Sequence, residues 1–84
     1  MKQGMLWFDD DPKRALSDKV ERAANRFNEK YGMVPTLAYA NPATMPESER
    51  VVHIVIIKTG NASDVQMKQA NSIMPNHFWL GVPA

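Results

Sequence analysis

The longest apolar run of the chain covers residues 51–58, Val-Val-His-Ile-Val-Ile-Ile-Lys. β-Branched residues have few side-chain rotamers and pack well on a pleated surface, so the run predicts a central β-strand. Alternate side chains of a strand point to opposite faces of the sheet. Both faces of this strand are mostly apolar, and each therefore needs a covering element. The odd-numbered face carries Val51, His53, Val55 and Ile57, and the even-numbered face carries Val52, Ile54, Ile56 and Lys58.

A second pattern, in residues 12–31, has the period of an α-helix. Apolar residues recur there at spacings of three, four and seven and form one stripe on the helix surface. Asp11 is the expected N-cap, because its side chain can accept a backbone N–H and Pro12 suits the first helical position. Gly32 is the expected left-handed residue at the end of the helix. The apolar stripe consists of Leu16, Val20, Ala23, Ala24, Phe27 and Tyr31.

Two shorter stretches predict further strands. Residues 35–40 are mostly apolar and are followed by the turn-forming pair Asn41 and Pro42. Residues 77–82 alternate large side chains between two faces, and an apolar segment of this kind is expected to be built into the sheet.

Two other stretches leave alternatives open. Residues 5–8 are either an edge strand or a segment whose aromatic side chains fill the end of the core. Residues 65–74 either form a hairpin with residues 51–58 or begin a helix at the capping box of Ser63 and Gln66. The hairpin is preferred, because it gives the central strand an adjacent partner through a short connection.

These elements predict a single α+β domain of residues 1–84, in which one long amphipathic helix packs on a small sheet of three to five strands. The sheet is expected to be mostly antiparallel or mixed. Because one helix covers one face, the odd-numbered face of residues 51–58 and one side of the last strand should stay open. Exposed apolar patches mark interaction surfaces. The interface predicted in this way consists of Val51, His53, Val55, Ile57 and Trp79.

Composition and charge narrow the classes of function only slightly. The chain has no cysteine, which excludes disulfides, thiolate metal sites and thiol nucleophiles. Ten basic and nine acidic residues give a net charge of +1, which favours no class of partner. No segment has the roughly 20 apolar residues that cross a bilayer, and the N-terminal stretch lacks the features of a secretory signal. A cytoplasmic location without membrane contact is therefore expected.

Basic residues form a ridge beside the apolar stripe of the predicted helix. Six of the ten basic residues lie within residues 12–31. Groups spaced along one helix could meet successive phosphates, so a nucleic-acid-binding protein is the alternative hypothesis. Interleaved acidic residues favour the simpler interpretation that long basic stems cover the margin of the stripe. The ridge consists of Lys19, Arg22, Arg26 and Lys30.

Signs of catalysis are weaker. The run Asp9, Asp10 and Asp11 could help to bind a divalent cation, but helix capping explains it more simply. His53 and His77 could hold zinc together with an aspartate if their strands were neighbours in register, which gives a metal-assisted hydrolase as the third hypothesis. The sequence contains no glycine-rich phosphate loop, nucleophile elbow or H-E-x-x-H motif. No catalytic residue, metal or cofactor is therefore assigned.

The favoured hypothesis is a non-enzymatic protein-binding or assembly module that uses an exposed sheet face. Its partner would be another protein or a second copy of the chain. Residues 29–32 and 75–81 resemble segments of small bacterial or phage-borne proteins, but this resemblance identifies no family and assigns no functional residue.

Overall fold

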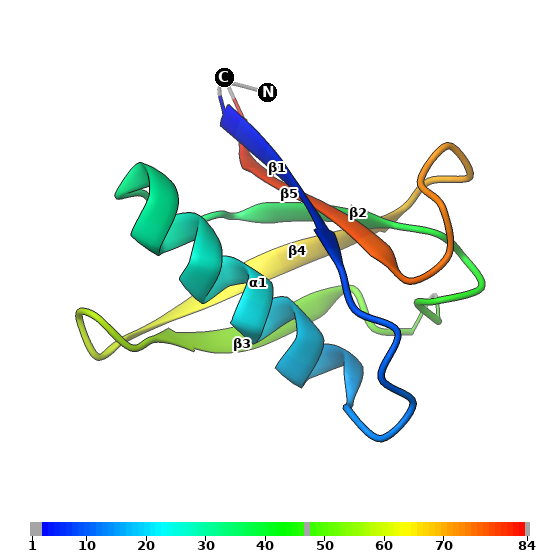
Figure 1. Cartoon of the computed structure of the whole chain (residues 1–84), viewed down its shortest axis with the longest axis horizontal. Helices are drawn as coiled ribbons and strands as arrows, with labels where there is room; N and C mark the ends of the chain where they lie inside the picture. The colour runs from blue at the N-terminus through cyan, green and yellow to red at the C-terminus, as the bar shows by residue number, and fades with distance from the viewer. Residues whose placement is uncertain (1–2, 47, 84) are drawn as a thin grey trace.

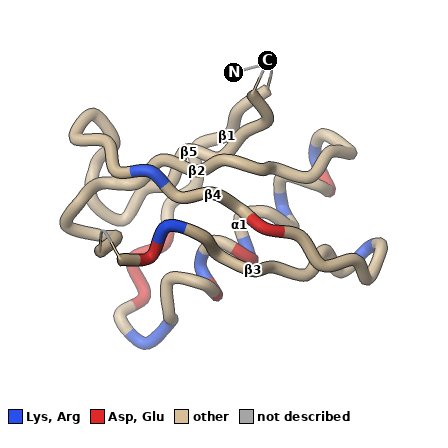
Figure 2. The backbone as a smooth tube through the Cα atoms, turned by 180° about the vertical axis from the view of Figure 1, so that it is seen from behind, with Lys and Arg blue, Asp and Glu red and all other residues tan. Residues whose placement is uncertain are grey.

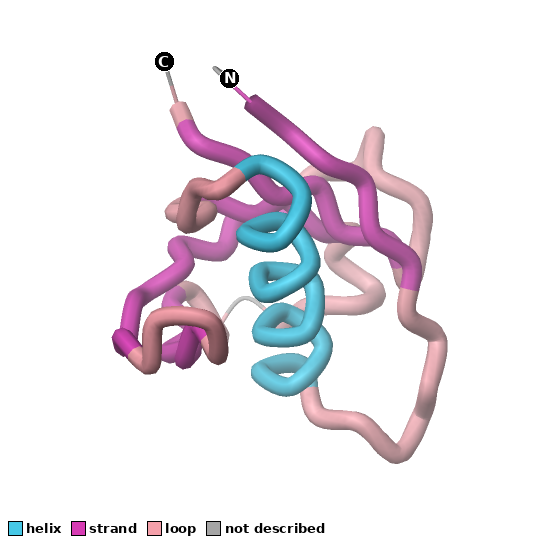
Figure 3. The backbone as a smooth tube through the Cα atoms, turned by 60° about the vertical axis from the view of Figure 1, so that its left-hand side comes forward, coloured by secondary structure: helices cyan, strands magenta, loops and turns pink. Residues whose placement is uncertain are grey.

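The computed structural model describes residues 3–46 and 48–83 and contains one helix on a five-stranded sheet (Figure 1). The helix lies across one face of the sheet, and no described element covers the opposite face (Figure 3). The predicted α+β fold is confirmed. In chain order the elements are β1 (Gln3–Phe8), α1 (Leu16–Tyr31), β2 (Leu37–Ala40), β3 (Val51–Ile56), β4 (Asn61–Gln69) and β5 (His77–Val82).

The strands lie in the order β1-β5-β2-β4-β3. β5 pairs antiparallel with both β1 and β2, so the last strand of the chain lies between two strands that run in the same direction. β2 and β4 pair in parallel, and β4 pairs antiparallel with β3. The sheet is therefore mixed, and β1 and β3 are its two edges.

The prediction of a central strand at residues 51–58 is wrong. β3 is an edge strand and ends at Ile56. Its even-numbered side chains Val52, Ile54 and Ile56 are buried under α1, while Val51 and Val55 stay exposed on the other face. The apolar run therefore has one covered face, where the sequence pattern predicted a strand buried between neighbours.

Side chains of α1 hydrogen-bond to the backbone of β3 along the free edge of that strand. Glu21 Oε2 accepts the N–H of Val55 at 2.9 Å. Asn25 Oδ1 accepts the N–H of Ile57 at 2.8 Å, and Asn25 Nδ2 donates to the carbonyl of Val55 at 3.0 Å. Glu21 and Asn25, called the edge clamp below, thus occupy backbone groups that another strand would otherwise pair with.

The helix begins later than predicted and ends where predicted. Its N-cap is Ala15, with φ −66° and ψ 157° and no side-chain cap. Asp11 instead accepts the N–H of Lys13 at 2.9 Å within a turn before the helix. At the other end, Gly32 has φ 68° and donates its N–H to the carbonyl of Asn28 at 2.8 Å. The expected left-handed end of the helix is confirmed.

Both segments left open by the sequence are strands. Residues 3–8 form the edge strand β1, and β4 pairs with β3 in a hairpin, so the helical alternative for residues 65–74 is wrong. β4 begins at Asn61, four residues before the predicted segment, and ends at Gln69. The strands expected at residues 35–40 and 77–82 are confirmed as β2 and β5.

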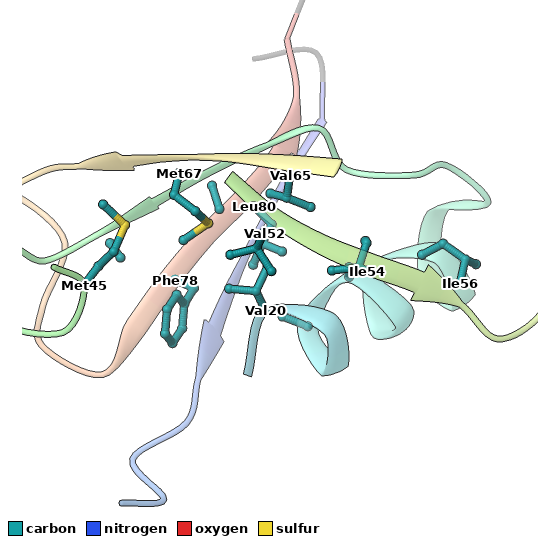
Figure 4. Packing of buried hydrophobic residues seen from close by; sticks show 13 residues of the cluster. Val20, Met45, Val52, Ile54, Ile56, Val65, Met67, Phe78 and Leu80 are labelled. Atoms are coloured by element: carbon teal, nitrogen blue, oxygen red, sulfur yellow. The ribbon is translucent and has the colours of Figure 1, made fainter. Parts of the chain in front are cut away.

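The hydrophobic core lies between α1 and the sheet (Figure 4). Ala23 and Ala24 of the helix are fully buried, as are Ala38 and Ala40 of β2, and these small side chains let the helix approach the strands closely. Phe27 of the helix is also fully buried, and its ring lies 4.9 Å from that of Tyr31. The larger members of the buried cluster in Figure 4 are Val20, Met45, Val52, Ile54, Ile56, Val65, Met67, Phe78 and Leu80.

The uncapped start of α1 gives a first prediction. Ala15 already has the extended backbone of an N-cap residue but offers no acceptor to the first helical turn. Ala15→Asp should therefore stabilise the protein by about 0.5–2 kcal/mol, measured as a higher urea midpoint at neutral pH. Ser17→Asp, within the helix, is the control for added charge, and an equal gain from both variants would contradict a capping effect.

The edge clamp gives a second prediction. Asn25→Ala removes three hydrogen bonds, to Glu21, Val55 and Ile57. The higher helix propensity of alanine offsets part of the loss, so we expect a net destabilisation of about 1 kcal/mol and aggregation through the exposed edge. Glu29→Ala, which removes only an exposed ion pair, is the control. Urea denaturation and light scattering measure both effects, and equal behaviour of the two variants would contradict the role of the clamp.

Candidate functional site

The face of the sheet opposite α1, called the open face below, carries alternate residues of all five strands. Trp79 of β5 lies opposite Leu6 of β1 on one side and Tyr39 of β2 on the other. Lys68 of β4 continues the same row beside Tyr39. The apolar and aromatic residues of β1, β5 and β2 on this face, called the open-face patch below, are Leu6, Phe8, Leu37, Tyr39 and Trp79.

Backbone rather than a covering element holds Trp79 in place. Gly4 and Gly81 lie opposite each other on β1 and β5, next to the row that contains Trp79. A Cβ atom added at Gly4 would lie 2.5 Å from Cζ2 of the indole ring. The ring therefore lies directly against the Gly4 backbone, in space that any side chain at this position would occupy. Glycine allows this close approach, and Trp79 is partly buried without any element above it.

A hollow of about 330 Å³ adjoins the patch. Leu6, His77 and Trp79 form its floor, and the loop between β4 and β5 contributes Ile73 and the exposed Met74 to its wall. Unbranched methionine adapts its shape to different apolar partners. Leu6 and Phe8 are themselves 55% and 54% exposed. The patch and the hollow together form one apolar region open to solvent.

Charge is distributed unevenly over the open face (Figure 2). β1, β5 and β2 carry no lysine, arginine, aspartate or glutamate within their described residues. Charged side chains begin at β4, with Lys68 beside the patch and Asp64 further along the strand. The patch is therefore bordered by charge on its β4 side and is uncharged at the β1 edge.

The five residues predicted as an interface fall into separate places. Val51, His53 and Val55 lie on the open face of β3. Trp79 shares that face, but β5 and β3 are separated by two strands, which corresponds to about 14 Å at the usual strand spacing. Ile57 follows β3 in a turn beside α1 and does not belong to the open face.

The residues nearest to Trp79 were not included in the sequence-based interface. Leu6, Phe8, Leu37 and Tyr39 join it only because β5 inserts between β1 and β2. The alternation along each short strand indicated which residues share a face. The strand order was needed to bring those faces together, and no pattern in the sequence specified it.

The two histidines do not meet. His53 Nδ1 lies 2.5 Å from Asp64 Oδ1, across the β3–β4 pair, and both side chains are mostly exposed. Such an exposed pair contributes only about 0–1 kcal/mol to stability. His77 lies on β5, where its Nδ1 is 2.9 Å from the carbonyl oxygen of Pro75. Within residues 3–46 and 48–83, no three histidine, aspartate or glutamate side chains gather in a way that could hold a metal ion.

The aspartate run organises the turn before α1. Asp9 is only 8% exposed and accepts hydrogen bonds from the N–H of Asp11 at 3.1 Å and from Arg14 Nη1 at 2.9 Å. Burial raises the pKa of Asp9, but the Asp11 N–H, the Arg14 guanidinium and the charge of Lys19 outweigh burial. The pKa of Asp9 therefore lies below its usual value. This carboxylate is engaged with the protein itself, which fits a structural role.

The basic ridge lies on α1, on the other side of the sheet from the open-face patch. Arg26 pairs with Glu29 at 3.3 Å. Lys30 Nζ lies 5.4 Å from the centre of the Tyr31 ring. Lys19 is half-buried, whereas Arg22 is exposed. Several members of the ridge thus already have neighbours on the helix surface, and the ridge and the patch form two distinct surfaces.

Comparison of the chain with protein-family models, with curated proteins and with solved structures gives no match. Among residues 3–46 and 48–83, no helix combines the length and the apolar character needed to span a bilayer. Function must therefore be argued from the geometry of the site.

Asp9 gives a third prediction, on acid stability. A carboxylate whose pKa is lowered in the folded state stabilises that state above its unfolded pKa of about 3.9 and loses this contribution as the pH falls through the folded value. Asp9→Asn should therefore unfold more easily than wild type at neutral pH, and the difference should shrink as the pH falls below about 4. Urea midpoints from neutral to acidic pH measure this effect. Asp10→Asn, at the exposed neighbour, is the control, and a constant difference for Asp9→Asn would contradict the prediction.

Proposed function

We propose that this protein is a non-enzymatic protein-binding module that docks a partner protein on its open face. The observation that carries this proposal is the uncovered open-face patch, with Trp79 held at its centre between Leu6 and Tyr39. Large apolar patches without cover mark interaction sites in soluble domains. Tryptophan and tyrosine are also the residue types most often found at the energetic centre of protein interfaces.

On the β4 side, the surroundings of the patch match the anatomy of an interface. Interface centres are depleted in charge and are enclosed by a polar rim. Here the centre lies on strands without charged residues, and Lys68 and Asp64 lie towards β4. The adjoining hollow of about 330 Å³ can receive a single aliphatic or aromatic side chain of a partner.

The strand that carries Trp79 is held by close packing on both of its faces. Trp79 is fixed against the Gly4 backbone, and its neighbours in β5, Phe78 and Leu80, are fully buried under α1. A side chain held in one position before binding loses less conformational entropy when the partner arrives. The patch is thus pre-organised for docking.

The size of the open face limits the expected affinity. Four strand spacings of about 4.8 Å and a strand length of about 20 Å give a face of roughly 400 Å². A stable interface usually buries about 800 Å² on each partner. Docking on this face alone should therefore be weak and transient.

The fourth prediction tests the docking surface. The wild-type protein, Trp79→Ala and the control Arg26→Ala on α1 are immobilised separately, and proteins from the cells that make this chain are captured on each. A partner of the open face should be retained by wild type and Arg26→Ala. Trp79→Ala should weaken its binding by about 2 kcal/mol, roughly 30-fold in Kd, in a titration of the purified pair. Circular dichroism checks that the wild-type protein and both variants are folded.

Two outcomes would contradict the proposal. One is an identical set of captured proteins on wild type and Trp79→Ala, with equal Kd values. The other is a partner whose binding depends on Arg26 and not on Trp79, which would move the binding site to the helix.

A further inference from the structure

Among residues 3–46 and 48–83, no strand pairs with the outer edge of β1, and the hydrogen bonds of β1 to β5 show which of its backbone groups are available. In an antiparallel pair, opposite residues alternate between those that exchange backbone hydrogen bonds and those that do not. The N–H of Asp9 donates to the carbonyl of Asn76 at 2.9 Å, in register with the β1–β5 pair. Counting back along β1, Trp7, Met5 and Gln3 bond to β5. The backbone groups of the alternate residues Gly4, Leu6 and Phe8 therefore point away from the sheet.

The two edges of the sheet differ. On β3 the same alternation turns Val55 outward, and the edge clamp of Glu21 and Asn25 occupies both of its backbone groups. On β1, no described strand, loop or side chain outside β5 makes a hydrogen bond to residues 3–8. α1 packs mainly against β3, and on the helix side of the sheet Trp7 of β1 lines a hollow with Arg22 and Arg26 of α1. Among the described residues, no side chain of α1 hydrogen-bonds to the backbone of β1. The edge clamp therefore occupies the β3 edge at Val55 and Ile57, whereas the outward groups of β1 have no such bond among the described residues.

β1 also lacks the devices that usually prevent strand pairing. Edge strands are commonly protected by charged residues, proline or a bulge. β1 has the sequence Gln-Gly-Met-Leu-Trp-Phe and its pairing with β5 is regular over all six residues. Because none of these residues is charged, two copies of the strand can lie side by side without repulsion between like charges.

We propose that β1 pairs antiparallel with β1 of a second copy of this chain, across a two-fold axis perpendicular to the sheet. A two-fold axis requires the same residues on both sides, and only a register that matches outward-pointing residues makes hydrogen bonds. The register that uses the whole strand places Leu6 opposite Leu6 of the second copy. Gly4 then lies opposite Phe8 on each side, so the ring of Phe8 meets the Trp79 indole that rests on the Gly4 backbone.

This pairing goes beyond the proposed function because it uses backbone groups at the edge instead of the open face. The pairing also extends the proposed function, because it enlarges the docking surface, and this extension rests on the proposed function. An axis perpendicular to the sheet leaves both helices on one side and both open faces on the other. The two open-face patches then meet at the axis, and the two open faces together form one surface of roughly 800 Å² under the same strand spacing. A pair of chains would offer a partner the area of a stable interface.

The fifth prediction tests the register through charge at the axis. Sedimentation equilibrium of wild type over a wide range of concentration should show a monomer–dimer equilibrium. Leu6→Lys and Leu6→Glu each place two like charges opposite each other, so each variant alone should dimerise at least roughly tenfold more weakly. Mixing the two variants should restore a mixed dimer, because the charges opposite each other are then complementary.

Backbone involvement is measured by amide hydrogen exchange. In concentrated wild type, the amides of Gly4, Leu6 and Phe8 should become protected relative to dilute protein. The amides of Met5 and Trp7, which already bond to β5, should change little. Leu6→Pro removes an outward N–H without breaking a bond to β5 and should abolish the dimer, and circular dichroism checks its fold.

A wild-type chain that stays monomeric at every concentration would overturn the inference, as would a dimer that Leu6→Lys and Leu6→Glu both leave unchanged. A wild-type dimer that the mixture of variants does not restore would overturn the proposed register. The two proposals fail separately. Trp79→Ala removes the centre of the open-face patch and leaves the β1 edge intact, so it should retain the dimer even where partner capture is lost.

Discussion

The position of α1 decides the rest of the structure. One 16-residue helix cannot cover a five-stranded sheet on both faces, nor guard both of its edges. The helix lies towards β3. There its apolar residues pack in the core, and the edge clamp hydrogen-bonds to the backbone of Val55 and Ile57. The open face and the outer edge of β1 lie beyond the helix and stay accessible. The molecule is therefore asymmetric: α1 covers one face of the sheet and part of the β3 edge, whereas the open face and the β1 edge are uncovered by any described element.

The order of the strands places the open-face patch on the uncovered face of the sheet. β5 is the last strand of the chain, yet it lies between β1 and β2. This insertion brings together aromatic and aliphatic residues from three segments that are distant in sequence, and it places Trp79 in their middle. The same insertion leaves β1 at the edge of the sheet, with β5 on one side and no described strand on the other. The docking surface and the pairing edge thus have one topological origin.

The periodic features of the fold could be predicted from the sequence. The stripe of the helix, its end at Gly32, the β3–β4 hairpin and the last strand follow from local patterns that tertiary contacts did not override. The expected N-cap failed because Asp11 and Asp9 bind to groups in the turn itself, Lys13 and Arg14, in place of the first helical turn.

The order of the strands and the contacts between distant segments could not be predicted from the sequence. An apolar run on both faces predicted a central strand, but the edge clamp satisfies part of the β3 backbone in a way that only the folded helix provides. Glu21 and Asn25 belong neither to the apolar stripe nor to the basic ridge of the predicted helix, and the helical periodicity did not indicate their bonds to β3. The open-face patch likewise depends on strand order, so Trp79 was identified from its own alternation and its neighbours were not.

The two tryptophans lie on opposite sides of the sheet. Trp7 packs against the core on the helix side, where its indole N–H is buried, and Trp79 rests on the open face against Gly4. The chain therefore contains two intrinsic fluorophores with separate environments. Emission from Trp7 reports the integrity of the folded core, and emission from Trp79 reports occupancy of the outer surface. Replacing either tryptophan by phenylalanine leaves the emission of one tryptophan, which reports a single process without any attached dye.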